Sequence, residues 1–291
     1  MFTSSDEVAS FIDKESIELV DVRFCDVPGV QQHFTIPVGE FLGGAIDDGL
    51  MFDGSSVRGF TAIHESDMKL VPDLSSAFVD PFRARATLVV DFSIVDPFTD
   101  EPFSRDPRQV AAKAEAHLRS TGIADQCFVG AEAEFYLFDD VRYQVSPNST
   151  FFSVDSPEAH WNTGRAEEGG NRGYKVPLKG GYFPVPPTDR YADVRDEMVR
   201  LLEGVGLTVE RAHHEVGSGG QQEINYRFAT LRAAADDMMK FKYVVKNAAL
   251  AFGHSATFMP KPLFGDNGSG MHTHISLWKN GEPLFYDERG Y

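Results

Sequence analysis

The segment that most constrains the fold of this chain is TVERAHHEVGSGGQQEINYRF, residues 208–228. Two extended runs flank Gly217–Gly220, a pattern that predicts a β-hairpin with a tight glycine-rich loop. Glu215 comes just before the glycines and Glu223 just after them, so the hairpin would place the two carboxylates close together. Taken alone, the segment also fits a solvated hairpin with charged edges.

Side chains two residues apart on a strand share a face. In the first half of the hairpin this rule groups Arg211, His213 and Glu215 on one face. Glu210 falls on the opposite face if the strand is regular.

The run FVGAEAEFYLF, residues 128–138, carries a second pair of glutamates. Alternation turns Glu132 and Glu134 to one face and the neighbouring alanines toward a core. Two adjacent carboxylates repel each other unless a cation lies between them. A metal role is one interpretation of this run, and an exposed glutamate pair on a strand is the other.

Two histidines follow a glycine-rich loop in FMPKPLFGDNGSGMHTHISLW, residues 258–278. The glycines allow the backbone to approach a ligand closely. His272 and His274 then alternate onto one face of a strand. The pair favours a metal or phosphate role, with a purely structural role as the alternative.

Together these segments indicate the kind of ion that the chain would bind. Several carboxylates with few histidines suit hard divalent ions such as Mg²⁺ or Mn²⁺ rather than Zn²⁺. The sequence has no GxxxxGK[ST] loop, and GDNGSG does not match a dinucleotide fingerprint. A nucleotide would therefore be held by metal ions and side chains. The residues alone predict a divalent-metal enzyme, with phosphoryl transfer as one candidate reaction and no named substrate.

A formal net charge of −17 gives the chain no overall attraction for nucleic acid or anionic membranes. The N-terminal residues include acidic side chains and no long apolar run, so they predict neither a signal peptide nor a membrane span. Cys25 and Cys127 lie in apolar runs without metal-ligand spacing, which fits buried thiols in a reducing compartment. These features predict a cytoplasmic protein with no nucleic-acid or membrane partner.

Helices and strands both recur along the chain. Strand-like runs with one helix fill roughly the first hundred residues, and later helices alternate with strands. The predicted helices, most of them marked by a capping residue or a terminal glycine, are Ser4–Asp13, Asp106–Thr121, Asp189–Glu203 and Thr230–Phe252. Residues 141–190 are rich in Pro, Gly, Ser and Asn and are expected to form a long loop excursion.

Several segments resemble, in the same order, those of bacterial type I glutamine synthetases. They are VDVRFCDVPGVQQHFTIP, FDGSSVRGF, HESDMKLVPD, GAEAEFYLFD, NRGYKVPLKGGYF, HHEVGSGGQQEIN and PKPLFGDNGSGMHTHISLW. The resemblance implies an α+β fold with a small β-grasp-like N-terminal domain over residues 1–100. A catalytic α/β domain with a curved antiparallel sheet would occupy residues 101–291. It also implies a homododecamer of two stacked rings, with each active site between neighbouring subunits.

The resemblance assigns metal ligands residue by residue. Glu134, Glu215 and Glu223 resemble the ligands of a first metal ion. Glu132 and His272 resemble two ligands of a second ion.

Substrate-binding positions follow in the same way. Glu210, His274 and Ser276 resemble positions that contact ATP. Asn267 and Gly268 resemble the pair that binds glutamate.

The implied reaction joins ammonia to L-glutamate, with Mg²⁺ or Mn²⁺ as cofactor, two or more ions per site, and ATP as co-substrate. The side-chain carboxylate of glutamate attacks the terminal phosphate of ATP, and ammonia then displaces phosphate from the γ-glutamyl phosphate. Asp53 resembles the residue that a neighbouring subunit contributes to the ammonium site, where it would accept a proton. The other interpretation of Asp53 is a turn residue in Asp-Gly-Ser-Ser.

Glutamine synthetases continue past the position that matches Tyr291, so the catalytic domain is expected to be incomplete in this chain. The rest of the family's catalytic domain supplies a further ligand of the second metal and the arginines that bind phosphate and glutamate. One alternative function is therefore a non-catalytic oligomer component or regulatory binder. Another is a γ-glutamyl-amine ligase of the same family, although the DGSS and GDNGSG motifs favour ammonia as the acceptor.

Overall fold

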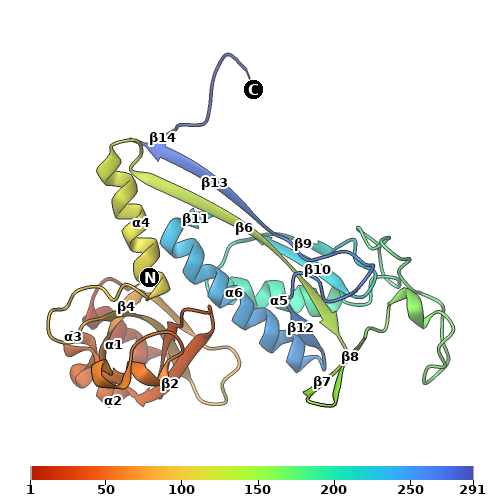
Figure 1. Ribbon diagram of the computed structural model, residues 1–291, viewed down its shortest axis with the longest axis horizontal. Helices are drawn as coiled ribbons and strands as arrows, with labels where there is room; N and C mark the ends of the chain where they lie inside the picture. The colour runs from red at the N-terminus through yellow and green to blue at the C-terminus, as the bar shows by residue number, and fades with distance from the viewer. Residues whose placement is uncertain (1, 291) are drawn as a thin grey trace. The chain divides into compact units, whose positions relative to one another are not determined.

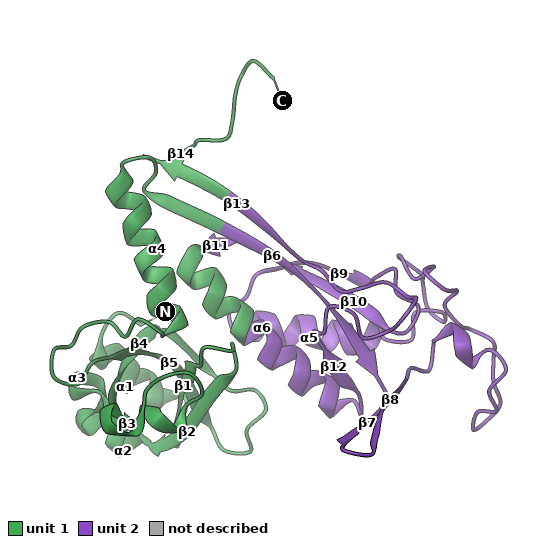
Figure 2. Cartoon of the chain, viewed as in Figure 1, with its two compact units in different colours: residues 1–128, 230–239, 276–291 green, residues 129–229, 240–275 purple. Residues whose placement is uncertain are grey.

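The computed structural model describes residues 2–290. The chain divides into two compact units, which Figure 2 shows in different colours. The first unit contains residues 1–128, 230–239 and 276–291, and the second contains residues 129–229 and 240–275.

A five-stranded sheet, within the red-to-orange part of Figure 1, forms the centre of the first unit, and its strand order is β2-β1-β5-β4-β3. β1 and β5 run parallel, and the other neighbouring pairs are antiparallel. These two inner strands are buried along most of their length, and most of their residues are apolar. The buried charges of Asp21 and Arg23 on β1 pair with each other at 2.8 Å. The strands are β1 (Leu19–Cys25), β2 (Gln31–Pro37), β3 (Leu50–Asp53), β4 (Asp67–Val79) and β5 (Thr87–Val95).

Helix α1 (Ser5–Lys14) packs against the core of this sheet. The Ser4 side chain accepts a hydrogen bond from the backbone N–H of Glu7, as expected for a serine that caps the start of a helix. Val8 and Ile12 lie one turn apart on the helix, and both are buried among the apolar side chains of the strands. Burial of each such side chain contributes about 1.5–3 kcal/mol, so the helix is held mainly by this stripe.

Helix α4 (Pro107–Thr121) follows the small sheet and has the ends that its sequence predicts. Asp106 accepts a hydrogen bond from the N–H of Arg108, and Gly122 ends the helix in a left-handed conformation with φ +69°. The shorter helical turns are α2 (Val38–Glu40), η1 (Phe41–Ala45), α3 (Ile46–Asp48), η2 (Gly54–Ser56), η3 (Ile63–Glu65) and η4 (His160–Asn162).

A second, larger sheet has the strand order β14-β13-β6-β10-β9, and β11 and β12 also pair with β6. β9 and β10 form the antiparallel hairpin that the glycine-rich segment predicts. The strands are β6 (Gln126–Phe138), β9 (Val209–His214), β10 (Gln221–Tyr226), β11 (Ala229–Thr230), β12 (Ser255–Thr257), β13 (Met271–Lys279) and β14 (Glu282–Pro283).

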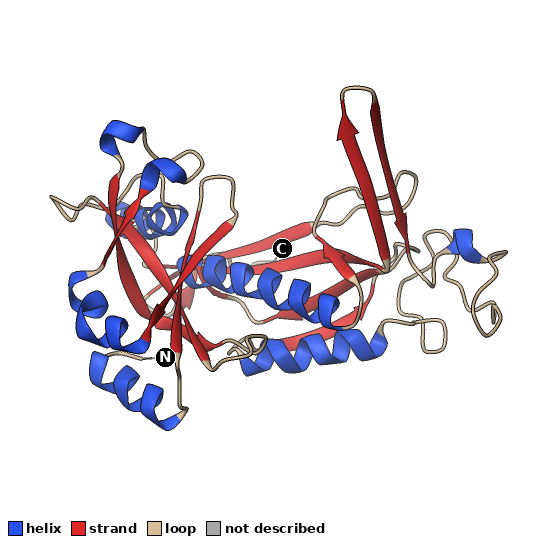
Figure 3. Ribbon diagram, turned by 90° about the horizontal axis from the view of Figure 1, so that it is seen from below, coloured by secondary structure: helices blue, strands red, loops and turns tan. Residues whose placement is uncertain are grey.

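Two helices pack on one face of the β6-β10-β9 part of this sheet, α5 (Ala192–Gly204) and α6 (Leu231–Ala251). The Phe241 ring of α6 lies 6.3 Å from Phe135 of β6 and 5.3 Å from Tyr226 of β10. Helix α5 contacts β9 and β10, and Figure 3 shows both helices running alongside the strands. This face, called here the helix face, carries apolar core side chains such as Phe135 and Phe241. The opposite face has a smaller apolar cluster of Tyr136, Phe138 and Leu263 beside its polar side chains.

The prediction of a long loop over residues 141–190 is wrong for the first part of this segment. Strands β7 (Asp140–Ser146) and β8 (Ser149–Asp155) form an antiparallel hairpin there. Its strands alternate polar residues with exposed apolar ones such as Tyr143 and Val145, a period of two that the loop-forming residues around it obscure. From Thr163 to Tyr191 the backbone has turns and irregular structure, as expected for a long loop.

The helix predictions are confirmed with small shifts at the ends. α5 begins at Ala192, three residues after the predicted start at Asp189, and α6 lies within the predicted range Thr230–Phe252. Among the described residues, no helix has the length and apolar character needed to cross a membrane. The two cysteines form no disulfide; Cys25 is buried and Cys127 only partly buried.

Candidate metal centre

A row of side chains crosses three neighbouring strands of the second unit. Glu134 of β6 lies opposite Glu223 of β10, and Glu223 lies opposite His213 of β9. Residues directly opposite each other in a sheet project from the same face. Because Phe135 points to the helix face, the row stands on the other side of the sheet.

Glu215 joins this row from the residues that follow β9. One donor atom from each of His213, Glu215 and Glu223 lies within 4.8 Å of the other two. His213 Nδ1 is 3.5 Å from Glu215 Oε1, and His213 Nε2 is 3.3 Å from Glu223 Oε2. The hairpin therefore brings Glu215 and Glu223 together, as its pattern predicts. Glu134, His213, Glu215 and Glu223 are called here the acidic cluster.

The charges in the acidic cluster affect one another. Burial, together with the charges of Glu223 and Glu132, raises the pKa of Glu134. Burial and the charge of Glu134 raise the pKa of Glu215. The interaction with His213 instead lowers the pKa of Glu223. Partly buried carboxylates this close repel each other, and a cation between them relieves that repulsion.

Glu132 forms a second group with the two histidines of β13. His272 Nδ1 is 3.2 Å from Glu132 Oε2, and His274 Nε2 is 2.8 Å from Glu132 Oε1. The two histidines thus share a face of the strand, as alternation predicts. Glu132 and Glu134 also share a face of β6, and the charges of Glu132 and His272 both act on the pKa of Glu134. This group therefore borders the acidic cluster.

These side chains form a donor set that fits hard divalent ions. Carboxylate oxygens dominate, imidazole nitrogens are in the minority, and no thiolate takes part, which is the donor chemistry of Mg²⁺ and Mn²⁺ sites. Burial first, and then the charges of neighbouring glutamates, raise the pKa values of Glu134 and Glu215, and a bound cation would offset both effects. The acidic cluster would hold one ion, and Glu132 with His272 would hold another.

The loop over residues 265–270 is fixed beside the cluster by buried hydrogen bonds. The Tyr136 hydroxyl donates to the carbonyl of Asn267 at 2.5 Å. Asp266, only 2% exposed, accepts from the N–H of Asn267 and from both the N–H and the hydroxyl of Ser218. Hydrogen bonds to both its N–H and its carbonyl thus fix the backbone of Asn267, which is predicted to bind glutamate.

Gly217 is a position where no larger residue fits. A Cβ at Gly217 would lie 2.1 Å from the Tyr136 hydroxyl oxygen and 2.7 Å from Gln221 Oε1. We expect Gly217→Ala to lower the free energy of unfolding by about 1–3 kcal/mol, because Tyr136 and Gln221 must move. Urea unfolding of the purified chain measures this change.

The control for Gly217→Ala is Gly204→Ala at the end of α5, where a Cβ would meet nothing within 4 Å. That substitution is expected to leave stability unchanged or to raise it by about 0.4–1 kcal/mol. If the two substitutions changed the free energy of unfolding equally, close packing around Gly217 would not be the cause of the loss.

Glu210 and Ser276 do not belong to either group of donors described above. Glu210 is exposed and forms an ion pair with Arg227 at 3.5 Å. The Ser276 hydroxyl accepts a hydrogen bond from Trp278 Nε1 at 3.0 Å. The ATP-contacting roles of Glu210, His274 and Ser276 stay predictions.

Asp53 lies in the first unit, at the start of a tight turn. Its Oδ1 accepts from the N–H and the hydroxyl of Ser55 at 2.9 and 2.5 Å, and its Oδ2 accepts from the Ser56 hydroxyl at 2.6 Å. These hydrogen bonds lower the pKa of Asp53, so the exposed carboxylate stays ionised. Asp53 therefore stabilises its own turn, and its ammonium role stays a prediction.

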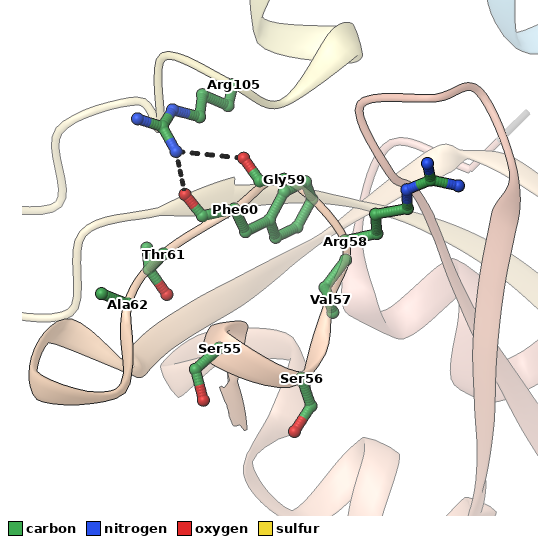
Figure 4. A pocket seen from close by; sticks show the side chains of 9 residues that line it. All are labelled: Ser55, Ser56, Val57, Arg58, Gly59, Phe60, Thr61, Ala62 and Arg105. Atoms are coloured by element: carbon green, nitrogen blue, oxygen red, sulfur yellow. Dashed lines mark hydrogen bonds between the residues drawn. The ribbon is translucent and has the colours of Figure 1, made fainter.

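The residues after this turn line a pocket of about 480 Å³ within the first unit (Figure 4). Arg105 donates from Nη1 to the carbonyl of Gly59 at 3.0 Å and also to the carbonyl of Phe60. Ser55 and Ser56 lie along the same pocket. Arg105 thus fixes the segment that follows Asp53.

Three residues of the candidate site had no role predicted from the sequence: His213, Tyr136 and Gln221. Alternation grouped His213 with Glu215, and this was the available signal for its place in the acidic cluster. Tyr136 and Gln221 gave no signal, because their contacts depend on the register between β6 and β10 and on a distant loop.

Two family models match the chain. One, described as the beta-Grasp domain of glutamine synthetase, matches residues 16–97. The other, described as the catalytic domain of glutamine synthetase, matches residues 104–291, a range that includes the whole acidic cluster. The domain boundary at residue 100 stays a prediction.

Known relatives and solved structures resemble the chain over most of its length. Glutamine synthetases from Streptomyces coelicolor and Frankia alni are 62% and 60% identical to it, and each comparison covers 100% of this chain and 61% of the relative. The chain thus spans about three fifths of the length of these relatives. The structure of Plasmodium falciparum glutamine synthetase matches with a TM-score of 0.89 and 29% identity, over 98% of this chain and 56% of that one. A GmaS/ADP complex matches with a TM-score of 0.74 and 26% identity, over 96% and 58%.

The two model matches cover most of the chain, and the structure has the mixed fold of helices and sheets that the resemblance implied, with antiparallel pairing of β6, β10 and β9 in the curved larger sheet. The chain therefore belongs to the glutamine synthetase family, with a β-grasp domain followed by catalytic-domain sequence.

Proposed function

We propose that the protein carrying this chain catalyses the ATP-dependent ligation of ammonia to L-glutamate, giving L-glutamine. The observation that carries this proposal is the acidic cluster, where Glu134, Glu215 and Glu223 meet on one face of the sheet. Membership of the glutamine synthetase family supports the same reaction class. The ADP in the similar GmaS complex supports nucleotide binding.

Each side chain has a proposed part in binding. Glu134, Glu215 and Glu223 hold one divalent ion, and Glu132 with His272 holds a second. Magnesium or manganese ions at these positions would polarise phosphoryl oxygens and screen the negative charge of the triphosphate.

The substrates are proposed to lie next to these ions. Glu210, His274 and Ser276 contact ATP, while Asn267 and Gly268 bind glutamate. The glutamate side-chain carboxylate attacks the terminal phosphorus, which forms γ-glutamyl phosphate and releases ADP. Ammonia then attacks the acyl carbon, loses a proton, and phosphate leaves.

Asp53 is proposed to act at the ammonium site of a neighbouring subunit in a homododecamer of two stacked rings. Its exposed carboxylate and lowered pKa suit the attraction of an ammonium cation. We expect Asp53→Asn to raise the KM for ammonium about 10-fold or more with little change in the KM for ATP, because a charge-assisted contact is lost. Steady-state kinetics measures both constants, and a parallel rise in both would contradict the assignment.

An assay of γ-glutamyl hydroxamate tests the proposed function. The protein carrying this chain is incubated with glutamate, ATP, hydroxylamine and Mn²⁺, and we expect hydroxamate that depends on both ATP and metal. Absence of product from folded, metal-loaded protein would favour the alternative of an oligomer component or regulatory binder. Turnover with ethanolamine or putrescine but not with ammonia would instead identify a γ-glutamyl-amine ligase.

A further inference from the structure

Gln221 is the first residue of β10 and is fully buried, with 0% exposure. It lies opposite Tyr136 of β6, on the same face as Glu134. Its neighbour Gln222 turns to the helix face, where it accepts a hydrogen bond from Arg195 of α5. The Gln221 amide is therefore an uncharged polar group enclosed within the acidic side of the sheet.

The side-chain amide of Gln221 makes four hydrogen bonds, the longest of them from Nε2 to the Ser269 hydroxyl oxygen at 3.4 Å. Nε2 donates to Glu134 Oε2 at 2.7 Å and to the carbonyl of Gly268 at 2.9 Å. Oε1 accepts from the N–H of Gly217 at 2.8 Å. The partners fix the orientation of the amide, because a carboxylate and a carbonyl only accept whereas a backbone N–H only donates.

These bonds join three segments that are far apart in the sequence. Glu134 lies on β6, Gly217 lies in the hairpin turn, and Gly268 lies in the loop over residues 265–270. Gly217 allows this approach because a Cβ there would come within 2.7 Å of Gln221 Oε1. One planar amide thus links a carboxylate of the acidic cluster to the loop proposed to bind glutamate.

We propose that Gln221 is a positioning residue that holds Glu134 and the Gly268 peptide in one geometry, ready for metal and glutamate. The proposal rests on the proposed function, which gives Glu134 and Gly268 their roles. With Oε2 bound by the amide, the direction of Oε1 is fixed as well. A preorganised ligand and loop lose less conformational freedom when metal and substrate bind.

The substitution Gln221→Glu tests this role because it keeps size and shape and replaces the donating group with an oxygen. That oxygen would face Glu134 Oε2 and the Gly268 carbonyl, neither of which can donate. We expect backbone amides within residues 265–270 to exchange hydrogen at least about 10-fold faster in metal-free protein. We also expect Mn²⁺ affinity to fall about 10- to 100-fold, as for other residues that orient metal ligands.

The matched control is Gln222→Glu, the same chemical change one residue away on the helix face. There the new carboxylate keeps an acceptor for Arg195, so exchange in residues 265–270 and Mn²⁺ affinity are expected to stay near those of the wild type. Gln221→Met provides a second variant without added charge, and it should also speed exchange in the loop. Circular dichroism confirms that each variant is folded.

Unchanged exchange in residues 265–270 for both Gln221 variants would overturn the proposal, as would equal effects of the Gln221 and Gln222 substitutions. Failure of the wild-type chain to bind Mn²⁺ would instead count against the proposed function. The two failures are distinguishable because the exchange measurement requires no metal.

Discussion

Replacing Glu215 with alanine is expected to weaken Mn²⁺ binding by about 100-fold or more while the chain stays folded. Glu215 contributes one of the three donor atoms that lie within 4.8 Å of one another. Loss of an outer residue that orients a ligand costs about 10- to 100-fold in metal affinity, so loss of a direct ligand should reach the upper end of that range or exceed it. Titration with Mn²⁺, followed by the electron paramagnetic resonance of the free ion, measures this affinity.

The fold should tolerate Glu215→Ala because the carboxylate is under repulsion. Burial and the charge of Glu134 raise the pKa of Glu215, so removing this carboxylate removes both a desolvated charge and the repulsion between the two glutamates. The expected control is Glu203→Ala, which removes an exposed carboxylate at the end of α5 and should leave Mn²⁺ affinity unchanged. If both variants bound Mn²⁺ as tightly as the wild type, Glu215 would not be a ligand.

Local patterns were sufficient to predict much of the candidate site. Alternation along a strand placed Glu132 and Glu134 on one face, and the glycine-rich turn folded Glu215 back toward Glu223. These inferences needed only distances along one strand or one hairpin. The helix ends were predictable for a similar reason, because capping by Ser4 or Asp106 involves residues within one turn.

What could not be predicted depends on contacts between distant segments. To predict that His213 joins the acidic cluster, one must know the register between β9 and β10, which sets His213 opposite Glu223. That register shifts between Asn225 and Tyr226, at the far end of the pair. The role of Gln221 requires both the β6–β10 register and the loop at Gly268. Neither register has a sequence signal as short as a turn motif, so both emerge only from the packed sheet.

A second large effect is expected in the first unit, where Arg108→Met should lower the free energy of unfolding by about 3–5 kcal/mol. The Arg108 guanidinium is buried and makes two hydrogen bonds to Asp236 at 2.8 and 2.9 Å. It also donates to Asp73 at 2.7 Å and to Ser93 at 3.0 Å. Methionine keeps much of the side-chain volume but leaves two partly buried carboxylates without this cation. Denaturation by guanidinium chloride measures the loss.

The control for Arg108→Met is Arg119→Met, an exposed arginine in the last turn of the same helix. Its interaction with the helix dipole is worth less than about 1 kcal/mol, so a much smaller loss is expected. Similar losses for the two variants would show that burial and pairing of Arg108 do not determine its contribution.

The pH dependence separates the charge of Arg108 from its packing. Burial alone would raise the pKa of Asp73, but hydrogen bonds from Ser75 and Arg108 hold it below the usual value. A carboxyl group with a lowered folded-state pKa adds stability above its unfolded pKa, and this stability is lost as the pH falls through the folded value. The wild-type chain should therefore lose stability below about pH 4. The Arg108→Met deficit should shrink over the same range, because protonation removes the carboxylate charges that Arg108 neutralised; in the variant Asp73 keeps its ion pair with Arg232 at 3.1 Å. A deficit of equal size at pH 7 and pH 3 would attribute the whole effect to lost packing.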